Sequence, residues 1–114
     1  MTKAPNVFAG LALQTTCRAI NNLETETLIR QQMSQTIEQL NKLIAGSKIF
    51  INSFSGLATK LVVLPEYFLT GFPMGEPIMK WASRACITPD GEEYDKLSRV
   101  AQDNGVYLSG NVYE

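Results

Sequence analysis

Histidine is absent from the 114 residues, and its absence excludes several kinds of active site. A Ser-His-Asp or Cys-His site, a His-ligated metal and the usual general base near neutral pH all require it. An excess of one charge is also lacking, since ten Lys and Arg residues face eleven Asp and Glu residues, for a net charge of −1. Without a basic surface to contact phosphates, we expect no nucleic-acid partner.

Cysteines are few, and long apolar runs are missing. Cys17 and Cys86 are too few for a disulfide framework, so we expect a reduced, cytoplasmic protein. No stretch approaches the roughly 18 apolar residues that span a bilayer, so we expect no membrane partner. The apolar run 7–13 follows Lys3, but Gly10 interrupts it and polar residues come next. This pattern favours a buried strand over a signal peptide.

The rest of the composition, with 45% hydrophobic residues, is ordinary for one compact globular domain. Strands are predicted at 7–14, 61–64 and 106–113, joined by crossovers long enough for parallel pairing. The first reads VFAGLALQ, which is typical of a strand covered on both faces. Pro65 ends the second strand because it has no amide hydrogen to donate.

A long helix is predicted over 22–46, from apolar residues spaced three to five apart. Asn22 is its expected N-cap and Gly46 its expected C-terminal stop. Ile51 and Phe54 roughly continue the spacing, so a second helical piece over 47–54 stays open, before a loop at 53–59. The apolar stripe consists of Leu28, Met33, Ile37, Leu40 and Ile44.

The second half begins with a turn-rich loop at 66–77, which holds two glycines and two prolines. A short helix at 79–86 carries Trp81, and a turn at 88–91 leads to a helix with Leu97, Val100 and Ala101 on its buried side, ended by Asn104-Gly105. The resulting order, strand-helix-strand-helix-strand, is that of an α/β fold.

Four acidic residues surround the start of this last helix: Asp90, Glu92, Glu93 and Asp95. Asp90 and Glu93 resemble a capping box. The group as a whole is expected to be surface charge favoured by the helix dipole, so no metal site is predicted there.

Glu66 is the main candidate for chemistry, because it follows the apolar run Leu61–Pro65 directly. An acid at the carboxyl end of a buried strand lies where ligands gather in α/β sheets. Partial desolvation there would raise its pKa toward the range of a general base. From position alone, a structural role stays open, with Glu66 capping a turn or pairing with a surface lysine.

The segment 61–76, LVVLPEYFLTGFPMGE, resembles the first catalytic block of the nitrilase superfamily, the carbon–nitrogen hydrolases. In that family an apolar strand ends in Pro-Glu and an aromatic, Gly-rich loop follows. The early Ala-Leu-Gln strand end, the long helix, the Asp-Gly turn and VYLSGNVYE match as well. The resemblance covers nearly the whole chain; 47–59 departs from it, since many members run almost directly from helix to strand.

The resemblance implies a partial α-β-β-α sandwich of the nitrilase type. Residues 1–114 would be the N-terminal part of a single carbon–nitrogen hydrolase domain, truncated after the third strand. The implied activity is hydrolysis of a small-molecule amide or nitrile, the amide being slightly favoured, by a Glu-Lys-Cys triad without a cofactor, in a homo-oligomer. The alternative is a non-catalytic truncated relative acting as an association module, since a half-sandwich would expose an apolar sheet face.

By this resemblance Glu66 is the catalytic glutamate, and Tyr67 and Phe72 line the substrate pocket. Packing in the core stays an equal interpretation for these aromatic rings. Oxyanion-type stabilisation would come from the family lysine and nucleophilic attack from the family cysteine.

The lysine and the cysteine of the triad find no match. Cys17 and Cys86 stand in other sequence contexts and are expected to be small buried or half-buried hydrophobes. Lys80 and Lys96 fall on predicted helices and are expected to be solvated. Only one third of the triad is present, so the 114-residue chain alone is predicted to be inactive.

Overall fold

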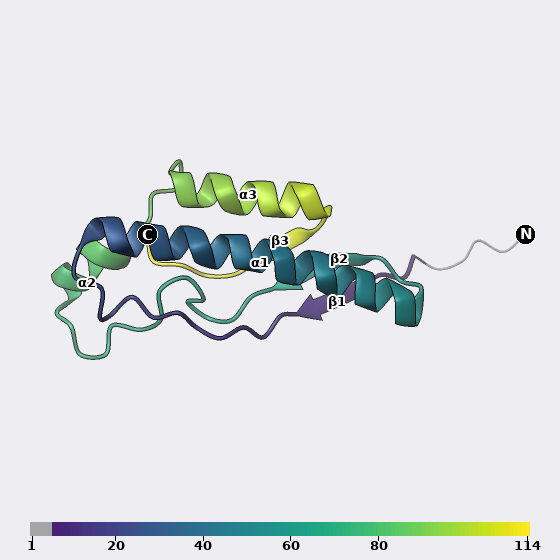
Figure 1. Ribbon diagram of the computed structural model, residues 1–114, viewed down its shortest axis with the longest axis horizontal. Helices are drawn as coiled ribbons and strands as arrows, with labels where there is room; N and C mark the ends of the chain where they lie inside the picture. Colours follow the sequence, from purple (N-terminus) through teal and green to yellow (C-terminus); the bar gives the residue numbers. More distant parts are fainter. Residues whose placement is uncertain (1–5) are drawn as a thin grey trace, which may run out of the picture.

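The computed structural model describes residues 6–114, which form a small α/β fold with a parallel sheet and three helices (Figure 1). This confirms the predicted α/β class. Both helices predicted between the second and third strands are present, so the short order strand-helix-strand-helix-strand leaves one helix out. The elements are β1 (Ala9–Ala12), α1 (Glu26–Ser55), β2 (Thr59–Val63), α2 (Ile78–Ala85), α3 (Glu92–Asn104) and β3 (Tyr107–Ser109).

The three strands pair in the order β1-β2-β3, all parallel. Val62 at the centre of the sheet pairs with Leu11 on one side and Leu108 on the other. The register shifts between Ala9 and Gly10, so Lys60 has no partner on β1. The connections from β1 to β2 and from β2 to β3 cross the sheet in the same direction. Right-handed connections of this kind place their helices on the same face of the sheet, and α1 and α3 lie side by side (Figure 1).

The other sheet face is uncovered in the described part of the chain. Val62 is completely buried, whereas its neighbours Leu61 and Val63 are 36% and 43% exposed. The prediction of strands covered on both faces is therefore wrong for this chain, because its helices pack on one side. The exposed face agrees with the expectation for a half-sandwich.

Helix α1 begins later than predicted. The Thr25 hydroxyl accepts a hydrogen bond from the Leu28 amide at 3.2 Å, so Thr25 is the N-cap in place of Asn22. Leu28 is 45% exposed, and Ile29 takes its expected place in the stripe. The other predicted stripe residues are buried: Met33, Ile37, Leu40 and Ile44.

Helix α1 also continues past Gly46 as one element of 30 residues. A glycine inside a helix costs only about 1 kcal/mol relative to alanine, which does not stop a helix of this length. Gly56 ends it, with φ 71° and its amide donating to the Asn52 carbonyl at 2.8 Å. Phe54, assigned to the apolar stripe, is 79% exposed instead.

Helix α3 has Gly91 at its N-cap and no side-chain cap. The predicted capping box is wrong because the Glu93 carboxylate binds the Arg30 guanidinium at 3.0 Å. Arg30 also donates to the Cys86 carbonyl at 3.2 Å. Glu93 is therefore buried between α1 and α3 and is not a surface charge.

The remaining boundaries lie close to their predictions. Helix α2 begins one residue early and buries Trp81, and Gly105, at φ 60°, ends α3. Strand β3 is shorter than predicted, since residues 110–113 leave the sheet. Among residues 6–114, no helix combines the length and the apolar composition needed to cross a membrane.

Candidate active site

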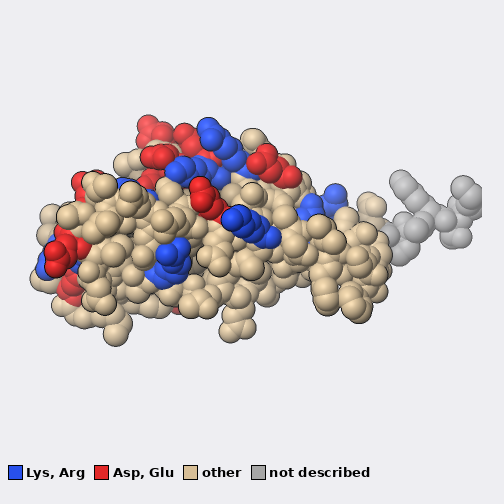
Figure 2. Space-filling view, in the orientation of Figure 1, with Lys and Arg blue, Asp and Glu red and all other residues tan. Residues whose placement is uncertain are grey.

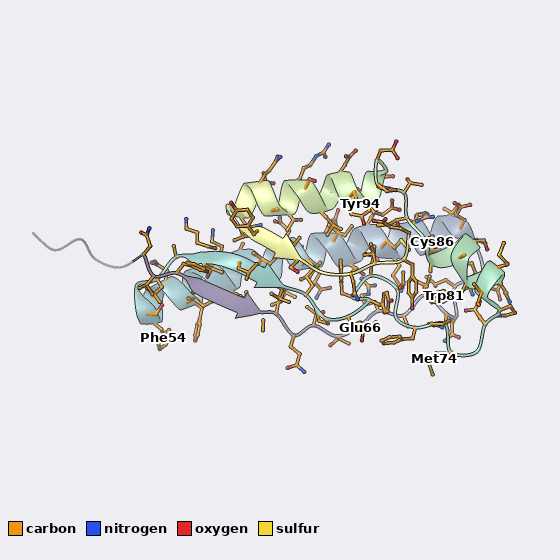
Figure 3. All side chains as sticks on the ribbon, turned by 180° about the vertical axis from the view of Figure 1, so that it is seen from behind. Phe54, Glu66, Met74, Trp81, Cys86 and Tyr94 are labelled. Atoms are coloured by element: carbon orange, nitrogen blue, oxygen red, sulfur yellow. The ribbon has the colours of Figure 1, made fainter. Side chains whose placement is uncertain are left out.

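Glu66 lies at the carboxyl edge of the sheet, where the backbone leaves β2 (Figure 3). Pairing continues just past the strand, because the Leu64 amide donates to the Ser109 carbonyl at 2.8 Å. Pro65 then has no amide hydrogen, and a turn begins at Glu66. This edge agrees with the place predicted for a ligand-binding carboxylate.

The Glu66 side chain is exposed, so the expected partial desolvation is not observed. Within the described residues it forms no ion pair and accepts no hydrogen bond from another side chain. Pairing with a surface lysine, the structural alternative, is therefore not observed. The carboxylate is free to meet a ligand.

Tyr67, next to Glu66, has a φ of 47°. Positive φ is strained for a residue with a Cβ and needs support from its surroundings. The Tyr67 amide donates to the side-chain oxygen of Asn111 at 2.7 Å, and its carbonyl accepts from the Gly71 amide at 2.9 Å. Hydrogen bonds at both its amide and its carbonyl thus hold Tyr67, the strained residue next to Glu66.

The turn is also anchored in the core. Phe68 and Leu69 are 3% and 1% exposed, and the Ile20 amide donates to the Thr70 carbonyl at 3.1 Å. A Cβ added at Gly110 would lie 3.2 Å from the Phe68 ring, so a glycine lets this segment approach the turn. The segments that follow β1 and β3 therefore pack against this turn, which itself follows β2.

Four aromatic side chains gather beside Glu66. The rings of Tyr67 and Tyr113 stack at 4.1 Å with 8° between their planes. Phe72 meets Tyr67 edge-on at 5.4 Å, and Trp81 meets Tyr113 edge-on at 5.6 Å. The two predicted pocket residues, Tyr67 and Phe72, are thus in contact, and two further rings extend the group.

Tyr113 provides a neutral hydroxyl in this group. Partial burial raises the pKa of Tyr113, and charge on Tyr67 and on Glu66 raises it further. The phenol therefore stays protonated at neutral pH and can donate a hydrogen bond. Tyr113 and Asn111 were missed at the sequence level, although the parallel order predicts that residues after β3 reach the edge where Glu66 lies.

A cavity of about 340 Å³ lies next to the aromatic group and is lined in part by Trp81, Tyr113, Glu76 and Cys86. Trp81 and Tyr113 form a wall shared by the cavity and the aromatic group. Small ligands fit a space of this size. The surroundings of Glu66 therefore offer a carboxylate, a neutral phenol, aromatic surface and an adjacent hollow.

The cysteines and lysines differ partly from expectation. Cys86 is half-buried as predicted, but Cys17 is exposed, although a Cβ added at Gly71 would lie 3.4 Å from its sulfur. Lys80 is exposed as predicted. Lys96 is not simply solvated, since its amine binds the Ser34 hydroxyl at 2.6 Å between α1 and α3.

Metal-binding side chains are not grouped in the described range. Among residues 6–114, no three or more Cys, Asp or Glu side chains come together as metal ligands would.

This chain is similar to one protein family and to two named enzymes. A family model described as carbon-nitrogen hydrolase matches residues 29–114. A cyanide hydratase of Alternaria brassicicola is 29% identical over 69 residues, and one of Pyrenophora teres f. teres is 30% identical over 69 residues. Each alignment covers 53% of this chain and 19% of the relative, so the matched part is about one fifth of the relatives' length. No solved structure matches significantly.

Proposed function

The chain belongs to the carbon–nitrogen hydrolase family, and we propose that it is the N-terminal part of a hydrolase acting on non-peptide carbon–nitrogen bonds, with Glu66 as general base. One observation carries the proposal. The glutamate of the Pro-Glu block has a free carboxylate at the ligand-binding edge of a parallel sheet, on a turn held by the segment after β3.

In the proposed reaction, Glu66 takes the proton of a cysteine thiol, and the thiolate attacks the carbon of a nitrile or amide. The glutamate then returns this proton to the substrate nitrogen: an amide loses ammonia or an amine and leaves an acyl thioester, whereas a nitrile becomes a thioimidate that keeps its nitrogen. Water then cleaves the carbon–sulfur bond, which releases the acid from the thioester or the amide from the thioimidate and restores the thiol. A lysine stabilises the charge of the tetrahedral intermediate. Both partner residues would lie in the rest of a four-layer α-β-β-α domain, of which residues 1–114 form about half.

A small nitrile is the substrate that we place first. The two relatives are named cyanide hydratases, which reverses the slight preference for an amide. The neutral hydroxyl of Tyr113 suits this role, because a donor near Glu66 can bind a substrate nitrogen without adding charge. Tyr67 and Phe72 would supply apolar surface.

The decisive experiment begins with the coding sequence after the Glu114 codon. We expect an open frame encoding a strand-end lysine and a Cys-Asp/Glu-x-x-aromatic-Pro block. In the protein from that frame, Glu66→Gln should lower kcat by roughly 10²- to 10⁴-fold for a simple nitrile. Glu38→Gln, on the exposed side of α1, is the matched control and should leave kcat unchanged.

The 114-residue chain alone should release no ammonia or amide product from nitriles or amides. Turnover by this chain, abolished by Glu66→Gln, would contradict the proposed role of the missing lysine and cysteine. Full activity of Glu66→Gln in the longer protein would contradict the role of Glu66.

A second candidate function, association without catalysis, is favoured by the uncovered sheet face. Leu61, Val63 and Tyr107 share this face and are all exposed. Size-exclusion chromatography tests it: a non-catalytic association module should form oligomers that Val63→Lys disrupts. A monomer with a cooperative thermal transition would rule it out.

A further inference from the structure

The last turns of α1 carry an exposed apolar cluster that the proposed hydrolase activity does not use. We call it the α1 tip and define it as Val7, Phe8, Ile49, Phe50 and Phe54, which are between 56% and 79% exposed. Phe50 and Phe54 are one helical turn apart, and their ring centroids lie 4.5 Å from each other. The Ala9 amide donates to the Ala58 carbonyl at 2.9 Å, which places residues 7–8 at this end.

The chain segment that carries most of the α1 tip has charge of one sign. No Asp or Glu occurs between Glu38 and Glu66, and this interval holds Lys42, Lys48 and Lys60. Figure 2 shows blue and tan atoms over this end of α1, while red atoms gather over α3 and toward the opposite end. In a protein with a net charge of −1, the tip is a locally basic and aromatic surface.

The opposite end of the molecule provides a contrast within the same chain. Met74, Ile78 and Met79 are each more than 80% exposed there. That cluster lies in the segment that also holds the exposed Glu66 and Lys80, and Glu76, whose carboxylate is paired with Arg84. Exposed apolar side chains next to a lysine therefore occur at both ends; the segment of the α1 tip differs in holding three lysines and no acid.

We propose that the α1 tip docks on an anionic lipid surface. Phe50, Phe54 and Ile49 would enter the boundary between headgroups and acyl chains, while Lys42 and Lys60 would lie among anionic headgroups. Apolar side chains flanked by lysines are the features that hold helices at such interfaces. The interaction is a surface contact and requires no spanning segment.

A second copy of the chain is a poorer occupant of the same surface. A two-fold contact brings a patch against itself, so the lysines of one tip would face those of the other. An anionic surface complements these charges. Lys48 is less available to anionic headgroups, because its amine already donates to the Asn104 carbonyl.

The α1 tip is remote from the candidate active site. Figure 3 shows Phe54 near the start of the strands, at one end of the molecule, and Glu66 beyond the opposite ends of the strands. Docking through the tip would therefore leave the Glu66 edge facing water.

Vesicle co-sedimentation of the 114-residue chain tests the proposal. We expect binding to vesicles of phosphatidylcholine mixed with phosphatidylserine, and little binding to phosphatidylcholine alone. Raising salt from roughly 0.1 M to 1 M should weaken binding, because the Debye length falls from about 10 Å to 3 Å. Lys42→Gln with Lys60→Gln should lower the partition coefficient about tenfold or more.

Phe50→Ser with Phe54→Ser should abolish binding, and since both side chains are exposed the fold should persist, as circular dichroism can verify. Ile78→Ser with Met79→Ser, at the opposite end, is the matched control and should bind like the unchanged chain. Absence of binding to anionic vesicles, or equal binding by the phenylalanine and control variants, overturns the proposal. If the unchanged chain binds no vesicles but self-associates, and the phenylalanine variant does not self-associate, the tip is instead an interface between copies of the chain.

Discussion

The side-chain oxygen of Asn111 accepts a hydrogen bond from the backbone amide of Tyr67 at 2.7 Å, across 44 residues of sequence. Tyr67 has a positive φ and directly follows Glu66. The segment after β3 thus fixes the turn that carries the proposed base. Several measurable consequences come from this contact and from others like it.

Replacing Asn111 by alanine should lower the free energy of unfolding by about 1 kcal/mol, because the strained Tyr67 amide loses its acceptor. Asn111→Asp keeps an acceptor oxygen in the same place, so the free energy of unfolding should fall by less. Urea denaturation of both variants measures the difference. Equal losses would show that the hydrogen bond does not support the turn.

Replacing Arg84 by methionine should destabilise the chain by about 2–4 kcal/mol. Its guanidinium binds Glu76 at 2.5 Å and also donates to the carbonyls of Ile20, Asn21 and Leu23, in a position only 17% exposed. The matched control is Arg99→Met, at an exposed position on α3. Its free energy of unfolding should lie within about 0.5 kcal/mol of that of the unchanged chain. Similar unfolding midpoints for the two variants would contradict this account of Arg84.

Replacing Gly46 by alanine should stabilise the chain by about 0.5–1 kcal/mol, because Gly46 lies inside α1 and no atom lies within 4 Å of an added Cβ. Gly56→Ala should destabilise it instead, since Gly56 has a φ of 71°. Thermal unfolding of both variants measures the pair. A destabilised Gly46→Ala variant would indicate that α1 is interrupted at this position.

Tyr94 and Tyr113 should ionise above the ordinary pKa of tyrosine when absorbance is followed at alkaline pH. Partial burial raises the pKa of Tyr113, and a hydrogen bond to Glu114 raises the pKa of Tyr94. The neutral hydroxyls therefore favour the folded state below pH of about 10, and this contribution is lost as pH rises through the folded pKa values.

Tyr113→Phe should remove one late-ionising tyrosine from this titration, and Glu114→Gln should bring the pKa of Tyr94 back toward its ordinary value. Tyr107→Phe, at an exposed position, controls for the loss of one phenol hydroxyl. A late component of unchanged size in Tyr113→Phe would show that the surroundings of Glu66 do not perturb this phenol.

Much of the fold could be predicted from local patterns. The apolar spacing of α1, the proline after β2 and the glycine after α3 each act within a few residues. One error arose where a distant contact outweighed a local signal: Glu93 binds Arg30 in place of its own helix terminus. Another arose because the local signal was too weak, since one glycine costs too little to end α1 at Gly46.

The sequence by itself determined the family block around Glu66, the α/β class and the absence of histidine, because these depend on residue identity and short-range spacing. Only the tertiary structure decided that Tyr113 and Asn111 join Glu66, that one sheet face is uncovered and that Phe50 and Phe54 face solvent. The physical reason is that parallel pairing brings together strand ends more than 40 residues apart. Burial likewise depends on which elements pack against each face, and no local pattern specifies that.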